Sequence, residues 1–306
     1  MLEIRTPTPD ELPRALALVL TQPGVPPGQT RAQVEAFLAC GLQSLPLSGQ
    51  WIAVEDGSIV AAVVCLDLPG QTSLVFIPSM RFHRRRQAVV IDLLRRVISA
   101  GRHRGVLLYQ VLVPPESEED ALVLGPAGFE RLAELVYLER PSTLPVPPFR
   151  EPGGITWTCY DQSVHPLFAE VIQATYEGSL DCPRLSGVRK IENILASHKA
   201  AGEFDPRRWF VVNFREHPVG CLLLARVPNR SALELVYMGL CPQARGQGLG
   251  KILLRRAVET ALGAGLAYVT LAVDAGNTPA CALYRWFGFY EATRRQTWIL
   301  TQTEHD

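Results

Sequence analysis

The sequence predicts a mixed α/β fold, close to the α+β type, built from two tandem domains. Its 306 residues exceed what a single hydrophobic core usually organises. The chain also repeats itself: an offset of 160 residues places RRQAVVIDLLRRV, from Arg85, over RGQGLGKILLRRA, from Arg245, and GPAGFE over RWFGFY. Between the copies, ERPSTLPVPPFREPGG is rich in proline and lacks hydrophobic periodicity, as expected of a linker. We therefore predict a first domain at 1–140, a Pro-rich linker at 141–153 and a second domain at 154–306.

Each copy shows the same order of patterns: a short strand, two helices, an antiparallel run of strands, a helix, a strand, a short helix and a last strand. Strands are indicated by β-branched and aromatic runs bounded by turn formers, and helices by apolar spacing that ends at glycine or proline. In the second copy the predicted strands are 155–160, 208–214, 219–227, 232–240, 267–273 and 291–300. The predicted helices there are 165–175, 187–200, 249–262 and 278–286. These elements predict a central sheet, mostly antiparallel, with helices on both faces.

Composition argues against several classes of function. Thirty Lys and Arg residues balance thirty Asp and Glu residues, so no excess of positive charge favours nucleic acid or an anionic membrane as the partner. No apolar run is long enough to span a bilayer and the first residues do not resemble a signal peptide, so we expect a cytoplasmic protein. The seven cysteines (40, 65, 159, 182, 221, 241 and 281) are never spaced as CxxC, so we expect neither a metal site nor a disulfide framework.

The most informative stretch is CPQARGQGLGKILLRRA, residues 241–257, where Gly246, Gly248 and Gly250 lie between a predicted strand and a predicted helix. A helix N-terminus offers unpaired N–H groups and a partial positive charge, and glycine lets a phosphate approach them closely. Arg245 adds a positive charge at the rim. The loop therefore predicts a phosphate site, the alternative being a turn without a ligand. Neither GxGxxG nor GxxxxGK[ST] is present.

Two motifs carry a resemblance to a known family. LCPQARGQGLGKILL resembles the pyrophosphate motif of the GCN5-related N-acetyltransferases (GNAT), Gln/Arg-x-x-Gly-x-Gly/Ala. DAGNTPACALYRWFGF is similar to the second motif of that family, supplied here by Asn277, Ala280, Leu283, Tyr284, Gly288 and Phe289. The resemblance covers the second copy and, more weakly, the first. The tandem arrangement is similar to that of the mycothiol synthases within the family.

The resemblance implies two tandem GNAT-fold domains, each with a splayed strand pair, and acetyl-CoA as cosubstrate without a metal. The pyrophosphate would lie on the amides of Arg245 to Gly250 and the pantetheine arm along Met238 to Leu240. Asn277 would bond that arm, or cap a helix. The implied cosubstrate site comprises Met238, Gly239, Leu240, Arg245, Gly246, Gln247, Gly248, Leu249, Gly250, Lys251, Asn277, Ala280 and Tyr284.

Acetyl transfer to an amine needs a proton donor for the thiolate and an acceptor for the amine proton. The family places a phenol at Tyr284, which we predict to be the general acid, the alternative being a core aromatic. Glu234 is the predicted base, directly or through water, because alternation puts it on one strand face with Val236, Met238 and Leu240. The alternative for Glu234 is a solvated strand end. Cys241 has no histidine near it in sequence, so we do not expect a covalent acetyl-enzyme.

The acceptor site is expected in YEGSLDCPRL, residues 176–185, where Tyr176, Glu177 and Asp181 are candidates to hold a cationic amine; solvated loop residues are the alternative. His198 at a predicted helix end is interpreted as a favourable partner of the helix dipole, with a base as the alternative. The basic run RFHRRR, residues 81–86, is interpreted as a solvated turn rather than an RNA contact.

The first copy lacks the residues that carry the chemistry. At the offset of 160, Gly248 becomes Ala88, Gly250 becomes Val90, Asn277 becomes Ser117 and Tyr284 becomes Leu124. We therefore predict a degenerate first domain that packs against and supports the second. The predicted function is an acetyl-CoA-dependent N-acetyltransferase that acts on a primary amine of a small molecule by direct transfer in a ternary complex. The alternatives are a non-catalytic acyl-CoA sensor or scaffold, and an acyltransferase with another donor or a hydroxyl acceptor.

Overall fold

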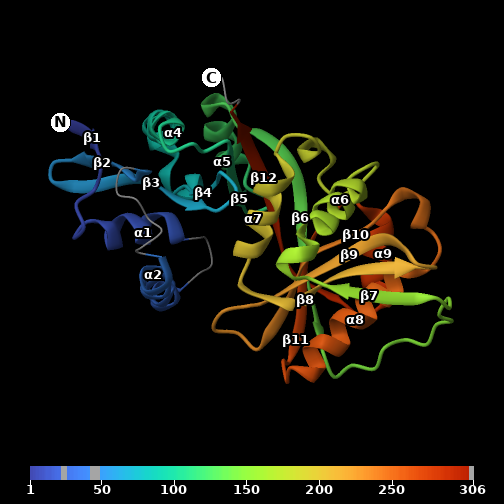
Figure 1. Ribbon diagram of the computed structural model, residues 1–306. Coiled ribbons are helices and arrows are strands. Elements are labelled where there is room, and N and C mark those ends of the chain that lie inside the picture. Colours follow the sequence, from blue (N-terminus) through green and yellow to red (C-terminus); the bar gives the residue numbers. More distant parts are fainter. Residues whose placement is uncertain (22–25, 42–48, 303–306) are drawn as a thin grey trace. The chain divides into compact units, whose positions relative to one another are not determined.

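The computed structural model describes residues 1–21, 26–41 and 49–302, and the chain divides into two compact units (Figure 1). Unit 1 comprises Met1–Leu132 and the segment that starts at Arg295, and unit 2 comprises Ala133–Arg294. Each unit is a mixed α/β structure around its own sheet, which confirms the predicted fold class. No helix in the described ranges is both long and apolar enough to cross a bilayer.

Unit 1 has a sheet in the order β1-β2-β3-β4-β5-β12, in which only β4 and β5 run parallel. Apolar side chains of α4 cover one face of this sheet, and those of α1 cover the other. The strands are β1 (Leu2–Arg5), β2 (Trp51–Glu55), β3 (Ser58–Leu68), β4 (Thr72–Phe76), β5 (Leu108–Val113) and the end of β12 (Tyr290–Thr301). The helices are α1 (Leu12–Leu20), α2 (Pro27–Gly41), α3 (Met80–His83), α4 (Gln87–Arg102) and α5 (Glu118–Leu124).

Unit 2 has a sheet in the order β6-β11-β10-β9-β8-β7, in which only β10 and β11 run parallel. Its strands are β6 (Glu130–Pro141), β7 (Ile155–Cys159), β8 (Glu203–Phe214), β9 (His217–Arg226), β10 (Ala232–Leu240) and β11 (Tyr268–Asp274). Its helices are α6 (His165–Thr175), α7 (Ile191–Ala200), α8 (Leu249–Gly263) and α9 (Thr278–Trp286). Every strand and helix predicted for the second copy is present. Helix α7 begins later than predicted, because Gly187 has a φ of 78° and Lys190 is extended.

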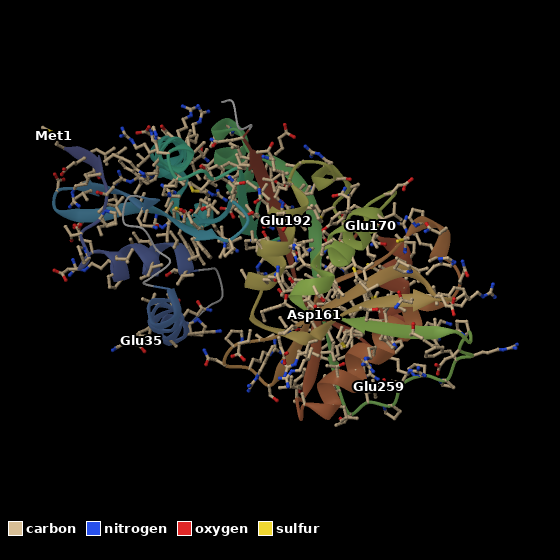
Figure 2. All side chains as sticks on the ribbon, viewed as in Figure 1. Met1, Glu35, Asp161, Glu170, Glu192 and Glu259 are labelled. Atoms are coloured by element: carbon tan, nitrogen blue, oxygen red, sulfur yellow. The ribbon has the colours of Figure 1, made fainter. Side chains whose placement is uncertain are left out.

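The helices of unit 2 cover both faces of its sheet because their apolar side chains recur at helical spacing. Helix α8 buries one such stripe against β9, β10 and β11 on one face. Helices α6 and α7 bury theirs against β8, β9 and β10 on the opposite face. The polar sides remain in solvent, as the exposed carboxylates of Glu170 on α6 and Glu259 on α8 show (Figure 2).

The last strand of each half completes the sheet of the other unit. Leu135 to Pro141 of β6 pair with the whole of β11, and Gln296 to Thr301 of β12 pair with β5. Contacts therefore divide the chain at Leu132 and at Arg294, whereas the sequence predicts domains at 1–140 and 154–306 with a linker between them. The difference arises because a terminal strand joins the sheet with which it forms hydrogen bonds along the strand edge. Such pairing between distant segments leaves no local signal in the sequence.

Arg140 fastens β6 within unit 2. Its side chain is fully buried, and its guanidinium donates hydrogen bonds to the carbonyl oxygens of Phe287, Pro141, Leu144 and Pro145 at 2.5 to 3.1 Å. A buried guanidinium is stable only when its donors are satisfied. The start of the predicted linker is therefore held against the end of α9.

Candidate active site

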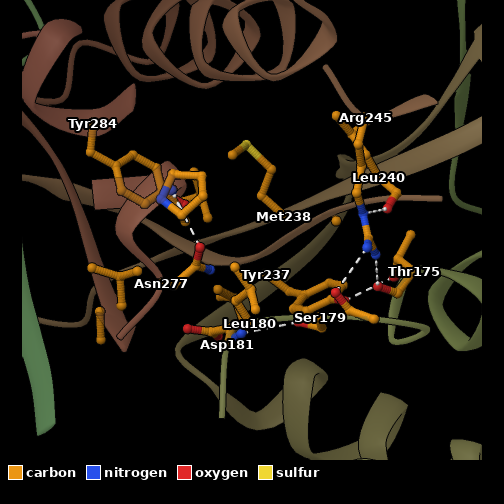
Figure 3. A pocket seen from close by; sticks show the side chains of 18 residues that line it. Thr175, Ser179, Leu180, Asp181, Tyr237, Met238, Leu240, Arg245, Asn277 and Tyr284 are labelled. Carbon is orange, nitrogen blue, oxygen red and sulfur yellow. Dashed lines mark hydrogen bonds between the residues drawn. The ribbon is translucent and has the colours of Figure 1, made fainter. Parts of the chain in front are cut away.

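Strands β10 and β11 separate part-way along their length. Their parallel pairing runs from Ala232, opposite Tyr268, to Glu234, opposite Thr270, and then stops, although both strands continue. A cavity of about 250 Å³ opens beyond Glu234. It lies between the ends of the two strands, the loop after α6 and the start of α9 (Figure 3). Among the described residues, the edge of β10 that faces this gap has no partner strand, so its backbone groups are available to a ligand, except the Leu240 carbonyl, which accepts from Arg245.

A β-bulge at Val236 changes which side chains face the gap. The register with β9 shifts between Leu235 and Tyr237, so the alternation of side chains reverses there. Met238 and Leu240 consequently pack toward α8, whereas Val236 and Tyr237 pack toward α6 and α7. The predicted common face of Glu234, Val236, Met238 and Leu240 is therefore wrong, because strict alternation holds only in an unbulged strand.

The glycine loop borders a second cavity, of about 330 Å³, at the same end of β10. Gly246 and Gly248 have φ of 75° and 81°, the left-handed region that favours glycine. The loop then enters α8 at Leu249. Within the part of the chain that the structure describes, the backbone N–H groups of Gly246 to Gly250 have no acceptor. Five successive free donors at a helix N-terminus form a site for an anion.

The glycines of the loop have different roles. A Cβ at Gly248 would have no heavy atom within 4 Å, so the backbone conformation is what requires glycine there. Gly250 lies in the first turn of α8, where a Cβ would come within 2.9 Å of the Leu283 Cδ2 atom. Of the two residues that alternate with the three glycines, Leu249 is buried in the core and Gln247 bonds the Gln243 carbonyl with its side chain. Only the backbone amides of Gln247 and Leu249 are therefore candidates for a ligand contact.

Arg245 is held by the protein itself. Its guanidinium donates to the carbonyl oxygens of Leu240, Thr175, Glu177 and Gly178 at 2.7 to 3.0 Å. These bonds connect the glycine loop to the end of α6 (Figure 3). The carbonyls at the end of a helix are good acceptors, so they fix the Arg245 side chain while its positive charge stays at the rim, where it lines both cavities. Lys251 is a second cation that lines this end, with Nζ 4.4 Å from the Trp286 ring centroid.

Helix α9 presents Asn277, Ala280 and Tyr284 to the gap. The Asn277 Oδ1 atom accepts from the Ala280 N–H at 3.3 Å, so Asn277 caps the helix while its amide still lines the cavity. Tyr284 is 5% exposed, and burial raises the pKa of its phenol, assisted by the negative charge of Asp181. The phenol is therefore protonated at neutral pH and is available as a proton donor.

A third cavity, of about 180 Å³, adjoins the gap. Ser179, Asp181, Val236 and Tyr237 line both, so they form the junction. The Asp181 Oδ1 atom accepts from the Asp274 N–H at 2.9 Å, which holds the loop against β11. Burial raises the pKa of the Asp181 carboxyl; the hydrogen bond from the Asp274 N–H opposes this rise, and the repulsion of the Asp274 carboxylate adds to it.

Two of the three acceptor candidates lie at these cavities. Tyr176 lines the third cavity and Asp181 lines the junction. The Glu177 side chain is exposed and lines neither cavity, because its place in the turn after α6 directs only its carbonyl inward, to Arg245.

The structure does not support the interpretation of His198 as a charged partner of the helix dipole. Its ring stacks on Tyr237 with centroids 5.2 Å apart, and its Nε2 lies 3.5 Å from the Tyr176 hydroxyl. Burial lowers its pKa to about 4, with a contribution from the charge of Arg189. A histidine with that pKa is neutral at pH 7 and adds no charge to the helix end.

Glu234 is the last residue of β10 that pairs with β11, and its side chain lines none of the described cavities. Burial raises the pKa of its carboxyl. Sequence reasoning missed Tyr237, whose position depends on the bulge, and it missed most of the wall after α6. The missed wall residues include Thr175, Ser179, Leu180, Ser186, Arg189 and Ile194. Ser179, Leu180, Ser186 and Arg189 come from the irregular segment between α6 and α7, which has no periodic signal, whereas Thr175 and Ile194 lie on those helices.

The corresponding region of unit 1 is closed. Strands β4 and β5 remain paired from Thr72 to Val75, one residue short of the end of β4, and the cavity there is about 30 Å³. No residue between Gln71 and Gly105 has a left-handed φ, so α4 begins without a glycine loop. Val90 and Leu124, the counterparts of Gly250 and Tyr284, are fully buried in the core.

Cys241 lies at the end of β10, next to the glycine loop. It is buried, and burial raises the pKa of its thiol, which disfavours the nucleophilic thiolate. The side chain of Cys40 lies outside the described residues. The other cysteines are free thiols.

Residues 173–289, which contain the gap, match the model of the Acetyltransferase (GNAT) family. The segment is a GNAT domain. It spans the loop after α6, the splayed strands, the glycine loop and α9.

Several known proteins are similar to this chain. The mycothiol acetyltransferase of Nocardioides sp. is 28% identical over 181 residues, which cover 54% of this chain and 60% of the relative. The match thus spans less than two thirds of that relative. A GCN5-related N-acetyltransferase structure from Sphaerobacter thermophilus has a TM-score of 0.66 and 18% identity, and covers 98% of this chain and 95% of its own. A tandem GNAT protein from the clavulanic acid biosynthesis pathway has a TM-score of 0.54 and 16% identity, with 98% of both chains covered. The two structures support the fold of the whole chain.

Proposed function

We propose that the chain is an acetyl-CoA-dependent N-acetyltransferase that acts on a primary amine of a small molecule, with unit 2 as the active unit. The observation that carries the proposal is the gap between β10 and β11, which joins a row of free amides at one end to a buried phenol and a carboxylate at the other. The names of the relatives support acetyl transfer. They do not supply the acceptor.

The residues present fit acetyl-CoA. The free N–H groups of Gly246 to Gly250 and the ammonium of Lys251 are suited to a pyrophosphate. The unpaired edge of β10 from Met238 to Leu240 is suited to the amides of a pantetheine arm, which the Asn277 amide would meet from α9. Bound acetyl-CoA supplies an activated thioester at the inner end of the gap.

The side chains at that end divide the proton transfers between them. Tyr284 donates a proton to the sulfur as the bond from carbon to sulfur breaks. Asp181 attracts the ammonium form of the acceptor into the junction. The Glu234 side chain lines none of the described cavities, which argues against direct contact with the amine, so we assign it the amine proton by transfer through water. Backbone N–H groups along β10 polarise the thioester carbonyl.

Unit 1 is proposed to be catalytically silent. Its paired strands leave a cavity of about 30 Å³, against about 250 Å³ in unit 2, and its helix start has no glycine loop. A pyrophosphate therefore finds no glycine loop there through which to approach the start of α4 closely.

Calorimetric titration of acetyl-CoA into the full chain tests the proposal. We expect one site per chain, and at least a hundredfold weaker binding for the Gly248→Val, Gly250→Val double variant, because valine disfavours a left-handed φ and its side chain would fill the loop. Ala88→Val at the equivalent of Gly248 in unit 1 is the control and should bind normally. Two sites would mean that unit 1 is not silent, and no binding would remove the proposal.

Tyr284→Phe separates catalysis from binding. The variant keeps the ring that packs on Phe289 at 5.7 Å between centroids but loses the proton donor. We expect acetyl-CoA affinity within about twofold of the parent and turnover reduced by about 10² to 10⁴, the range of general acid catalysis. Full turnover in this variant would assign the proton to another group, and binding without turnover of any amine in the parent would favour a sensor.

A further inference from the structure

The third cavity, beside the gap, has a chemistry that the general proposal does not use. It is walled by aromatic rings, those of Tyr176, Tyr237 and His198, with Tyr176 and Tyr237 centroids 5.4 Å apart. Such walls favour a compact apolar or planar group. Two charged side chains also line the cavity, one acidic and one basic.

The first charged position is Asp181, at the junction with the gap. A group that reaches the gap from the third cavity passes this carboxylate. An ammonium group is therefore favoured at the junction.

The second charged position is Arg189, which lines the third cavity but not the gap. Its side chain is half-buried, and Nη1 donates to the Ser197 Oγ atom of α7 at 3.0 Å, which fixes the direction of the guanidinium. Its positive charge contributes to the low pKa of His198, so the guanidinium acts on the rings that wall the cavity. Among the described residues that line this cavity, Arg189 is the one side chain that carries a positive charge at neutral pH, because His198 is neutral.

The other cations of the site lie elsewhere. Arg245 is bonded to four backbone carbonyls, and Lys251 lines the glycine-loop cavity, which shares no residue with the third cavity. The charges therefore follow an order along the cavities: a carboxylate at the junction and a guanidinium in the third cavity, separated by aromatic walls.

We propose that the acceptor is an amino-carboxylate, whose ammonium lies at Asp181 and whose carboxylate is bound by the Arg189 guanidinium across the aromatic-walled cavity. This rests on the proposed function for its reactive end. A planar guanidinium matches a carboxylate with two parallel hydrogen bonds, and the partly dry surroundings strengthen that pairing. The volume of about 180 Å³ restricts the acceptor to a small molecule or to one end of a larger one.

Matched acid and carboxamide probes test the inference, because each pair differs in charge but hardly in size. The probes are 4-aminobutyrate, 6-aminohexanoate and 4-(aminomethyl)benzoate, each with its carboxamide. Affinity is measured on the full chain by ligand-observed NMR, with and without coenzyme A, and turnover is measured with acetyl-CoA. We expect at least one acid to bind about tenfold more tightly than its carboxamide, the effect of one hydrogen bond to a charged group.

Variants of Arg189 test whether this residue causes the preference for the acid over the carboxamide. In Arg189→Met the acid and the carboxamide should bind equally, and in Arg189→Lys part of the preference should return, because the charge remains without the planar fork. Arg184→Met is the matched control on the same loop, since Arg184 is exposed and lines no described cavity, and it should keep the full preference. Acetyl-CoA affinity should be unchanged in all three variants, which also reports that they fold.

The outcomes separate the two proposals. Equal affinity for acid and carboxamide in the parent, no binding of either, or a preference that survives Arg189→Met overturns the amino-carboxylate inference even if amines are acetylated. A preference that depends on Arg189, without turnover of any probe or other amine, supports the binding site and removes the proposed acetyl transfer.

Discussion

Burial shifts the proton affinities of the side chains around the gap toward their neutral forms. It raises the pKa of Tyr284, Asp181 and Glu234, and it lowers the pKa of His198 to about 4. The common cause is the loss of hydration of the charged form. A phenol that stays protonated beside carboxylates of raised pKa is the arrangement that general acid and base catalysis requires near neutral pH.

The raised pKa of Glu234 can be measured through the pH dependence of the free energy of unfolding. Below the pKa of an unfolded glutamate, about 4.3, the carboxyl is protonated in both states. As the pH rises through the raised pKa of the folded state, the unfolded state ionises first and the fold loses stability. We therefore expect Glu234→Gln to be more stable than the parent at pH 8, with a smaller difference at pH 4.5, when urea midpoints are compared.

Glu170→Gln is the control for that comparison, because Glu170 is exposed on α6 and the substitution should give the same small difference at both pH values. A stabilisation by Glu234→Gln that does not change with pH would mean that packing, rather than ionisation, accounts for it.

At the scale of elements, the end of α6 is attached directly to β10. The Thr175 hydroxyl lies 2.8 Å from the Tyr237 hydroxyl and donates to the Ile172 carbonyl at 2.7 Å, while Arg245 bonds the Thr175 carbonyl. Strand β10 approaches α6 closely at Gly239, since a Cβ there would lie 2.6 Å from the Thr175 Oγ1 atom. The wall of the gap thus depends on the absence of a side chain in a strand.

Gly239→Ala should therefore destabilise unit 2 and weaken acetyl-CoA binding together. Overpacking of this kind costs about 1 to 3 kcal/mol, and the displaced α6 loop would also disturb the carbonyls that hold Arg245. Urea unfolding followed by tryptophan fluorescence, with calorimetric titration, checks both effects.

Gly263→Ala at the end of α8 is the matched control, because a Cβ there meets no atom within 4 Å and alanine favours a helix. It should be neutral or slightly stabilising. If Gly239→Ala behaves in the same way, α6 is not held against β10 as the geometry indicates.

At the scale of the whole molecule, neither half of the sequence contains its own complete sheet. Unit 2 needs Ala133 to Pro141, and unit 1 needs the segment from Arg295. Val136 and Leu138 of β6 are buried in the core of unit 2. Each such side chain contributes about 1.5 to 3 kcal/mol, and Arg140 adds its buried hydrogen bonds.

Two fragments that differ only at the start test this organisation. The fragment 133–294 should be a folded monomer that binds acetyl-CoA, whereas 154–294 should aggregate, because it exposes the edge of β11 and loses the buried side chains of β6. Size-exclusion chromatography and calorimetric titration measure both properties. Equal folding of the two fragments would contradict the role of β6, and rescue of 154–294 by extension to residue 306 would show that β12 substitutes for it.

The sequence by itself determined the order and type of the elements in the second copy, the glycine loop, and the positions of Asn277 and Tyr284 on one helix. It could do so because these features are local: apolar period, positive-φ glycines and motif spacing act within one or two elements. The tertiary structure alone decided which terminal strand completes which sheet, the side of β10 on which Tyr237 lies, the carbonyls that hold Arg245, and the meeting of Asp181 and Arg189 at one cavity. These depend on strand register, on a one-residue bulge and on contacts between distant segments, for which a single sequence has no local signal.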